Sequence, residues 1–222
     1  MRYLVYLTVI VCLLSAPYYC DAHILSVLIL AYYTAYVGQC WNLLLGYAGQ
    51  LSFGHALYTG LGSYLAAGLY IKFGWSPWLT MIPIIASNGL LGSFLGFLGF
   101  RSGARGVYFT LLTIAFAECG RIIFEHLPWS GGNAGLFIPL SSIQDFWSLR
   151  LSITTFYYVF LVLMLTGLGI SYVFLKTRLG YFSLATRENE QAAQALGIST
   201  FKVKTTVMGL SAALTSLGGI FY

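Results

Sequence analysis

The sequence predicts an all-α, polytopic membrane protein built as a bundle of transmembrane helices, and three observations carry that prediction. Hydrophobic residues make up 59% of the 222 residues and charged residues only 8%, whereas soluble domains contain roughly a quarter charged residues. The apolar residues gather in runs of about 20, the length at which a helix crosses a bilayer. One long polar interval, residues 176–204, holds five of the eleven Lys and Arg residues and is predicted to lie outside the membrane.

About seven apolar segments are long enough to be spans, and residues 1–222 are treated as a single transmembrane domain. The segments are residues 3–20, 24–46, 51–71, 77–100, 106–127, 152–175 and 204–222. The first segment also has features of a signal peptide, because small residues precede Pro17. A proline directly after the cleavage site is unfavourable, so a retained first helix is predicted.

The basic residues predict the orientation of the chain. With the N-terminus in the cytoplasm, eight of them fall inside and three outside, as the positive-inside rule requires. The inner set is Arg2, Arg101, Arg105, Lys176, Arg178, Arg187, Lys202 and Lys204, and the outer set is Lys72, Arg121 and Arg150. The loop at 128–151 is then external, and its run at 129–135 is predicted to form turns rather than helix.

The second and third segments are separated only by residues 47–50, so one of them is predicted to be broken or re-entrant. Three glycines fall within nine residues, at 46, 49 and 54, and weaken a helix locally. Non-helical backbone at membrane depth survives where protein or a water-filled cavity satisfies it, as along a substrate route. The polar side chains here are candidate pathway residues, namely Asn42, Gln50, Ser52 and His55. A tight cytoplasmic hairpin is the alternative interpretation.

A stripe of small residues marks the fourth segment, where Gly89, Gly92, Gly96 and Gly99 recur at helical spacing. Such a stripe lets another helix approach closely. It indicates either a contact with another subunit or packing inside one chain.

The fifth segment carries three ionisable residues on one helix face: Glu118, Arg121 and Glu125. At spacings of three and four, the arginine can pair with both carboxylates. Ionisable groups inside a membrane are costly and often functional. Glu118 and Arg121 are therefore candidates for a translocation pathway, and a structural ion pair near the outer interface is the alternative.

Several chemistries are not supported by the sequence. None of the four lysines follows a glycine, so a phosphate-binding loop is absent and any ATP hydrolysis must occur on another chain. Three scattered histidines and four cysteines without paired spacing suggest neither an enzyme site, a metal centre, a disulfide framework nor a cofactor on this chain. The net charge of +5 lacks the clustering that nucleic-acid binding requires.

The polar interval predicts a short alanine-rich helix. Good helix formers run from Ser183 to Leu196, Gly197 is a natural stop, and Lys202 and Lys204 mark the return to the membrane. A helix with so little bulk suits a groove on a partner. A solvated basic loop that only fixes topology is the alternative.

Two blocks of the sequence form extended motifs. One is Asn42-Leu-Leu-Leu-Gly-Tyr-Ala-Gly-Gln-Leu-Ser-Phe-Gly-His55 followed by Gly60-Leu-Gly-Ser-Tyr64. The other is Arg187-Glu-Asn-Glu-Gln-Ala-Ala-Gln-Ala-Leu-Gly-Ile198 followed by Ser211-Ala-Ala-Leu214. In these blocks the chain resembles the permease subunits of branched-chain amino-acid ABC transporters, in particular the LivM type, and Phe116-Ala-Glu118 and Ser130-Gly-Gly-Asn-Ala-Gly135 add weaker support.

The resemblance implies a multi-pass permease of the bacterial inner membrane that imports leucine, isoleucine or valine. Its expected partners are a second permease, two ATPases and a periplasmic or extracellular solute-binding protein. The polar interval would be the coupling loop that docks on the ATPase, through Arg187, Glu188, Glu190, Ala192, Ala193 and Gly197. Members of the family usually continue further, so a chain truncated at its C-terminal end is also expected.

Other readings of function stay open at this point. Relatives of such permeases carry urea or short amides, and the quoted blocks do not separate these substrates. An ion-coupled secondary transporter, with Glu118 and Arg121 as the coupling pair, would show transport that depends on pH or sodium and survives loss of an ATPase.

Overall fold

The structure, a computed structural model, describes residues 13–132, 135–136, 149 and 151–222, and these residues form helices and turns without strands. The elements are α2 (Ala22–Asn42), the π-helix η1 (Leu43–Tyr47), α3 (His55–Phe73), α4 (Pro77–Arg101), α5 (Val107–His126), the 3-10 turn η2 (Pro128–Ser130), α6 (Ile153–Leu175), α7 (Arg178–Glu188), α8 (Glu190–Ala195) and α9 (Thr200–Phe221). The predicted all-α class is confirmed.

Four of the described helices are long and apolar enough to cross a membrane. They are Ala22–Tyr47, Pro77–Arg101, Val107–His126 and Ile153–Leu175. Two further long helices, α3 and α9, are not among these four, since α3 contains His55 and Lys72 and α9 contains Lys202, Lys204 and many Ser and Thr residues. The first predicted segment lies mainly outside the described residues, so the count of seven spans stays a prediction.

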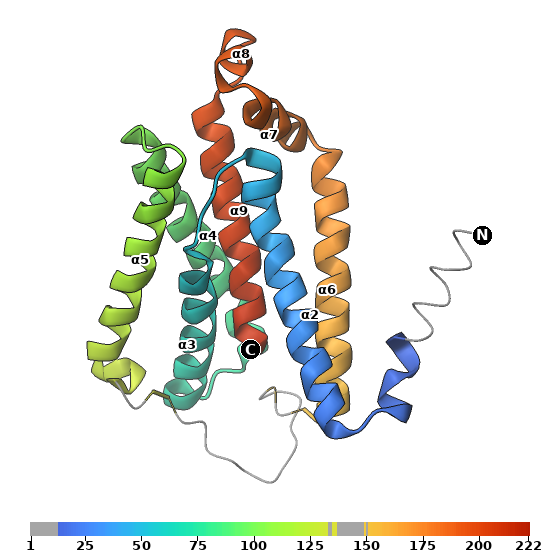
Figure 1. Ribbon diagram of the computed structural model, residues 1–222. Coiled ribbons are helices and arrows are strands. Elements are labelled where there is room, and N and C mark those ends of the chain that lie inside the picture. The colour runs from blue at the N-terminus through green and yellow to red at the C-terminus, as the bar shows by residue number, and fades with distance from the viewer. Residues whose placement is uncertain (1–12, 133–134, 137–148, 150) are drawn as a thin grey trace, which may run out of the picture.

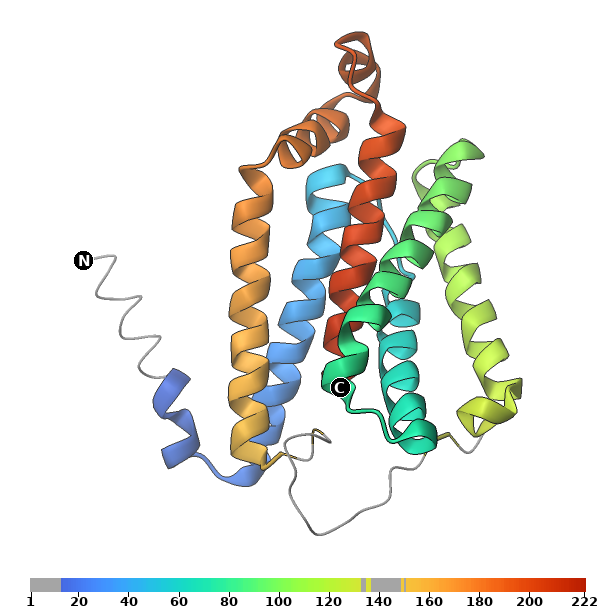
Figure 2. The same cartoon turned by 180° about the vertical axis from the view of Figure 1, so that it is seen from behind.

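Helix α9 is the centre of the bundle and packs against α4, α3 and α2 (Figures 1 and 2). The α4–α9 contact depends on Gly92, where an added Cβ atom would overlap the methyl group of Ala212. On α3, a Cβ atom on Gly62 would overlap the backbone carbonyl of Ser216. Small residues thus let three helices approach closely, as they do in membrane bundles generally.

The glycine stripe of α4 therefore serves packing inside the chain. Gly89, Gly92 and Gly96 face α9, and Gly99 faces the ring of Phe109 on α5. Of the two interpretations drawn from the sequence, the structure supports the intramolecular one.

A second contact joins α2 to α6 through buried tyrosines. The hydroxyl groups of Tyr32 and Tyr157 lie 2.9 Å apart, and the hydroxyl of Tyr36 donates to the carbonyl of Leu214 on α9 at 2.8 Å. Each of these three tyrosine hydroxyl groups has a partner, as polar groups in an apolar interior require.

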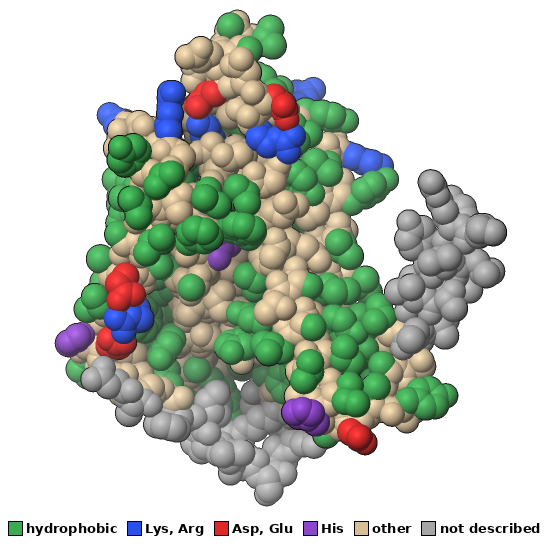
Figure 3. Space-filling model, viewed as in Figure 1, with side chains coloured by type: hydrophobic (Ala, Val, Ile, Leu, Met, Phe, Trp, Pro, Cys, Tyr) green, Lys and Arg blue, Asp and Glu red, His purple; other side chains and the backbone are tan. Residues whose placement is uncertain are grey.

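The two ends of the bundle differ in charge. Seven of the nine described Lys and Arg residues belong to the end that carries α7 and α8 (Figure 3). Lys72 lies in the last turn of α3, at the opposite end of the bundle, where the connection after α5 also begins. Much of that connection lies outside the described residues; its start forms the single 3-10 turn η2, and Gly131, Gly132 and Gly135 have positive φ, so the described part forms turns as predicted.

Candidate functional site

Helices α7 and α8 lie at one end of the bundle and connect α6 to α9 (Figure 1). The predicted short alanine-rich helix is present as α8, and the helix formers before it belong to α7, because the chain is extended at Asn189, with φ −155°. The Oδ1 atom of Asn189 accepts a hydrogen bond from the Ala192 N–H at 3.0 Å and so begins a new helix. The predicted stop at Gly197 is confirmed, since its φ of +83° is left-handed.

A buried ion pair fixes α8 to the start of α9. The Lys204 Nζ atom lies 2.7 Å from Glu190 Oε1, and the Lys204 side chain is only 6% exposed. The Thr200 hydroxyl donates to the same carboxylate oxygen at 3.2 Å, and Gln194 Nε2 donates to that hydroxyl at 2.8 Å. The ring of Phe100 on α4 lies 5.7 Å from Lys204 Nζ. We call this set the α8–α9 brace.

The brace also sets the charge state of Glu190. Partial burial raises the pKa of this carboxyl group, but the hydrogen bond and positive charge of Lys204 act in the opposite direction. The Thr200 hydroxyl and the charge of Arg105 add to the lowering, so the pKa of Glu190 lies below its ordinary value. The carboxylate therefore stays ionised at neutral pH.

The tip of α8 is exposed and partly apolar. Leu196 is 82% exposed, and Ala192 and Ala195 beside it are exposed as well. We call residues 190–197 the α8 knob. Sequence reasoning missed Leu196, although it is the one large apolar residue of the run 187–197, a signal that could have found it.

The six residues predicted to contact an ATPase divide into two groups. Arg187, Glu188, Ala192 and Gly197 are exposed, whereas Ala193 is buried and Glu190 turns its carboxylate toward Lys204. Arg187 pairs with Glu188 and also donates from Nη1 to the carbonyl of Gly46 in η1 at 2.6 Å. The last turn of α7 is thereby tied to the junction between α2 and α3.

The junction after η1 is a broken helix rather than a tight hairpin. Its extended chain runs from the α7 end of the bundle down to the start of α3 (Figure 1). Its backbone groups find side-chain partners, as non-helical backbone at this depth requires. The Phe53 N–H donates to Thr113 Oγ1 at 3.2 Å, the Thr110 hydroxyl to the Leu51 carbonyl at 3.1 Å, and the indole of Trp41 to the Ser52 carbonyl at 2.7 Å.

His55 begins α3 and joins it to the central helix. Its Nε2 atom lies 2.8 Å from the hydroxyl oxygen of Ser211 on α9, and that hydroxyl donates to the carbonyl of Cys40 at 2.6 Å. The Ser211 proton is thus already used, so Nε2 carries the proton of the imidazole and donates it. His55 is buried and holds three helices together.

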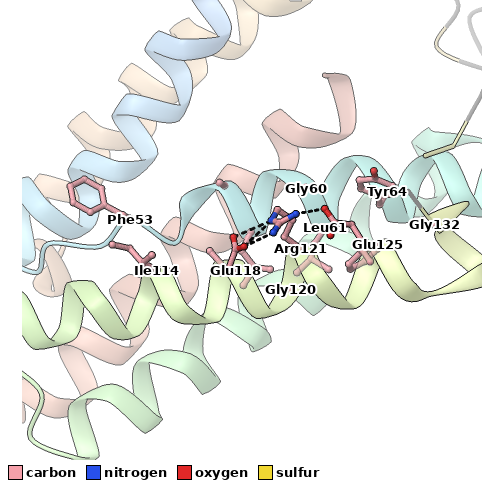
Figure 4. A pocket seen from close by; sticks show the side chains of 14 residues that line it. Phe53, Gly60, Leu61, Tyr64, Ile114, Glu118, Gly120, Arg121, Glu125 and Gly132 are labelled. Atoms are coloured by element: carbon pink, nitrogen blue, oxygen red, sulfur yellow. Dashed lines mark hydrogen bonds and ion pairs between the residues drawn. The ribbon is translucent and has the colours of Figure 1, made fainter. Parts of the chain in front are cut away.

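A groove of about 340 Å³ lies between α3 and α5 (Figure 4). Glu118, Arg121 and Glu125 project into it from α5, and we call them the ion triad. Arg121 Nε donates to both oxygens of Glu118, at 3.0 and 3.1 Å, and Nη1 donates to Glu125. The predicted pairing of Arg121 with both carboxylates is confirmed.

The six predicted pathway residues are not brought together in one site. Glu118 and Arg121 line the groove, whereas Ser52 and His55 are buried away from it and Asn42 and Gln50 are not among its lining residues. The groove is also lined by residues that sequence reasoning did not assign to it, among them Phe53 and Gly60. Gly60 opens the second part of the first motif, which was the available signal.

A sequence model of the branched-chain amino acid transport system permease component matches residues 23–222, nearly the whole chain. The chain belongs to this family. Family membership and the described helices make it a membrane-embedded component of a transport system. The resemblance seen in the two motifs is therefore confirmed.

Two curated relatives show the same relationship. The high-affinity branched-chain amino acid transport system permease protein LivM of Escherichia coli (strain K12) is 28% identical over 211 residues, which cover 84% of this chain and 49% of that protein. The LivM protein of Salmonella typhimurium (strain LT2) is 27% identical over the same shares. The chain spans about half the length of these relatives. The comparison with solved structures found no match.

Proposed function

We propose that this chain is a permease subunit of an ATP-binding-cassette importer for branched-chain amino acids in a bacterial inner membrane. The α8 knob carries the proposal: it is small, it exposes Leu196, and the Glu190–Lys204 ion pair ties it to the central helix of the bundle. A separate ATPase would receive the knob, and motion of the ATPase would then move α9 and the helices packed on it. Coupling of this kind works only if the ATPase contacts differ between its states.

The surroundings of the knob indicate the chemistry of its partner. Leu196 is exposed at the tip beside the exposed Ala192 and Ala195, so the knob offers a partner a small apolar contact. Basic residues gather at the same end of the bundle (Figure 3). The partner surface would therefore be an apolar pocket with an acidic rim. By the positive-inside rule this end is cytoplasmic.

The ion triad supports assembly with a second permease. Glu118 and Arg121 are 53% and 56% exposed on a helix long enough to span the membrane. Charged groups facing lipid are expensive, so this face of α5 would meet protein or water. A second permease across a shared aqueous pathway satisfies that need, and a solute-binding protein would deliver substrate at the end opposite the α8 knob.

Crosslinking from the knob tests the proposal. The variant Leu196→Cys, with the exposed Cys119 replaced by serine, should capture an ATPase subunit in intact membranes. Val107→Cys is the matched control, because Val107 is 70% exposed at the same end of the bundle but lies at the start of α5. Equal capture by both variants, or capture by neither, would contradict the coupling assignment.

An ion-coupled secondary transporter is the second candidate, and the half-exposed ion triad is the observation that favours it. Uptake that survives deletion of the ATPase and follows the proton or sodium gradient would establish it. Within the importer family, competition of labelled leucine uptake by urea and short amides identifies the substrate class.

A further inference from the structure

The groove between α3 and α5 has two chemically different parts. The ion triad with the Tyr64 side chain forms its polar part, and apolar side chains form the remainder (Figure 4). These apolar residues include Phe53, Leu57, Leu61, Ile114 and Phe124. A volume of about 340 Å³ lies at the lower end of the roughly 300–1,000 Å³ found for small-molecule sites.

The polar part carries an excess negative charge. Two carboxylates share the single guanidinium of Arg121, so the triad has a formal charge of −1. Its exposed carboxylate oxygens can accept further hydrogen bonds, while the guanidinium offers a partner to an anionic group. The groove therefore suits a small zwitterion whose ammonium group meets the carboxylates and whose apolar part lies along the remaining wall.

One position on the groove wall, Gly60, is open because glycine has no side chain. A Cβ atom added to Gly60 would meet nothing within 4 Å, whereas one added to Gly120 on the facing helix would overlap Leu57. Two residues along, Gly62 faces the backbone of α9 and supports packing. A side chain at position 60 would thus enter the groove without disturbing the contacts of α3.

We propose that the α3–α5 groove binds a zwitterionic amino acid with an apolar side chain, and that Gly60 sets the largest side chain it accepts. The inference rests on the proposed function for the identity of the substrate class. A transmembrane helix of the second permease is the competing occupant, and it predicts a different outcome for the same substitutions.

The test compares Gly60→Leu with Gly169→Leu in the complete assembled transporter. Gly169 is the matched control, since it is exposed on α6 and an added Cβ atom there also meets nothing within 4 Å. Gly60→Leu should lower uptake of leucine at least about tenfold relative to uptake of alanine, the scale on which a few methylene groups change selectivity. Gly169→Leu should leave the ratio unchanged, and both variants should still co-purify with the second permease.

Two results would overturn the inference. Unchanged selectivity in Gly60→Leu would show that the position does not meet the substrate. Loss of co-purification, or an equal loss for every amino acid, would assign the groove to a subunit contact instead.

A binding readout separates this inference from the proposed function. In Gly60→Cys, millimolar L-leucine should slow labelling by a soluble maleimide, whereas urea should not, and Gly169→Cys should show no protection. Protection of the cysteine by leucine without leucine uptake would support the binding groove and contradict the proposed transport function. Leucine uptake without protection would support the transport function and contradict the binding groove.

Discussion

The α8–α9 brace and the ion triad contain the same kinds of group in opposite settings. In the brace, Lys204 is 6% exposed and Glu190 is 25% exposed, and hydroxyl and amide groups complete the network. In the triad, Arg121 and Glu118 are both more than half exposed. Breaking a buried pair is costly because it leaves an unpaired buried charge, whereas exposed pairs contribute little to stability. The brace therefore fixes a shape, and the triad is available to a ligand.

The helices that carry these groups differ in the same way. Helix α9 is buried along most of its length by α4, α3 and α2. Helix α5 has only three buried residues, Phe109, Thr110 and Thr113, all in its first half. Its second half, which holds the triad, faces α3 across the groove (Figure 4). A force applied at the knob would reach the whole bundle through α9, while α5 keeps one face for a partner or an aqueous pathway.

The largest effect is expected from Glu190→Ala, with Glu188→Ala as its matched control. Removal of Glu190 leaves Lys204 unpaired in the interior, which costs about 3–5 kcal/mol. Amide hydrogen exchange over residues 190–197 should accelerate strongly, and ATP hydrolysis should uncouple from uptake. Glu188 is 70% exposed, so its removal should change exchange little.

A compensating variant sharpens that result. Replacing both partners, as Glu190→Leu with Lys204→Met, should recover much of the lost protection, because apolar groups of similar volume can replace a buried ion pair. Equal exchange in Glu190→Ala and Glu188→Ala would show that the brace does not hold the knob.

A smaller effect, on transport rather than stability, is expected from Glu118→Gln. The substitution removes one carboxylate of the exposed triad, so the thermal midpoint should change little while the KM for leucine rises several-fold. Uptake kinetics and a thermal scan of the same preparation measure both quantities. Unchanged uptake kinetics would show that Glu118 has only a structural role, and the triad would then not differ from the brace in function.

The smallest effect is expected from pH. Because the pKa of Glu190 is lowered in the folded protein, its stabilising contribution is complete above the ordinary pKa of about 4.5 and is lost as pH falls through the lower folded value. Protection of the α8 knob, corrected for the intrinsic exchange rate, should hold down to pH 5 and decline below that. A decline that begins near pH 6 would contradict the assigned charge state.

Helix positions were largely predictable from the sequence because they depend on local properties. The predicted segment 77–100 appears as Pro77–Arg101 and the segment 152–175 as Ile153–Leu175. Apolar run length and terminating residues such as Gly197 report directly on local conformation. The break at Asn189 escaped prediction because an asparagine is tolerated inside a helix as well as at its start.

The candidate sites were predictable only as sets of residues. The sequence placed Glu118, Arg121 and Glu125 on one face of a helix, since helical spacing alone determines that arrangement. It did not reveal that Phe53 and Gly60 share the groove with them, or that Ser52 and His55 lie elsewhere. Those facts depend on how α3 packs between α5 and α9.

The sequence by itself determined that this protein is a membrane-embedded helix bundle of the branched-chain amino acid permease family with one polar element outside its apolar segments. Composition, helical periodicity and two motifs carry that information within short stretches of chain. Only the tertiary structure decided that Glu190 faces Lys204, that Arg187 reaches the Gly46 carbonyl, and that Leu196 stands free at the tip. Burial and pairing arise from contacts between segments that are distant in the sequence. A local sequence pattern does not determine which distant segment a side chain will contact.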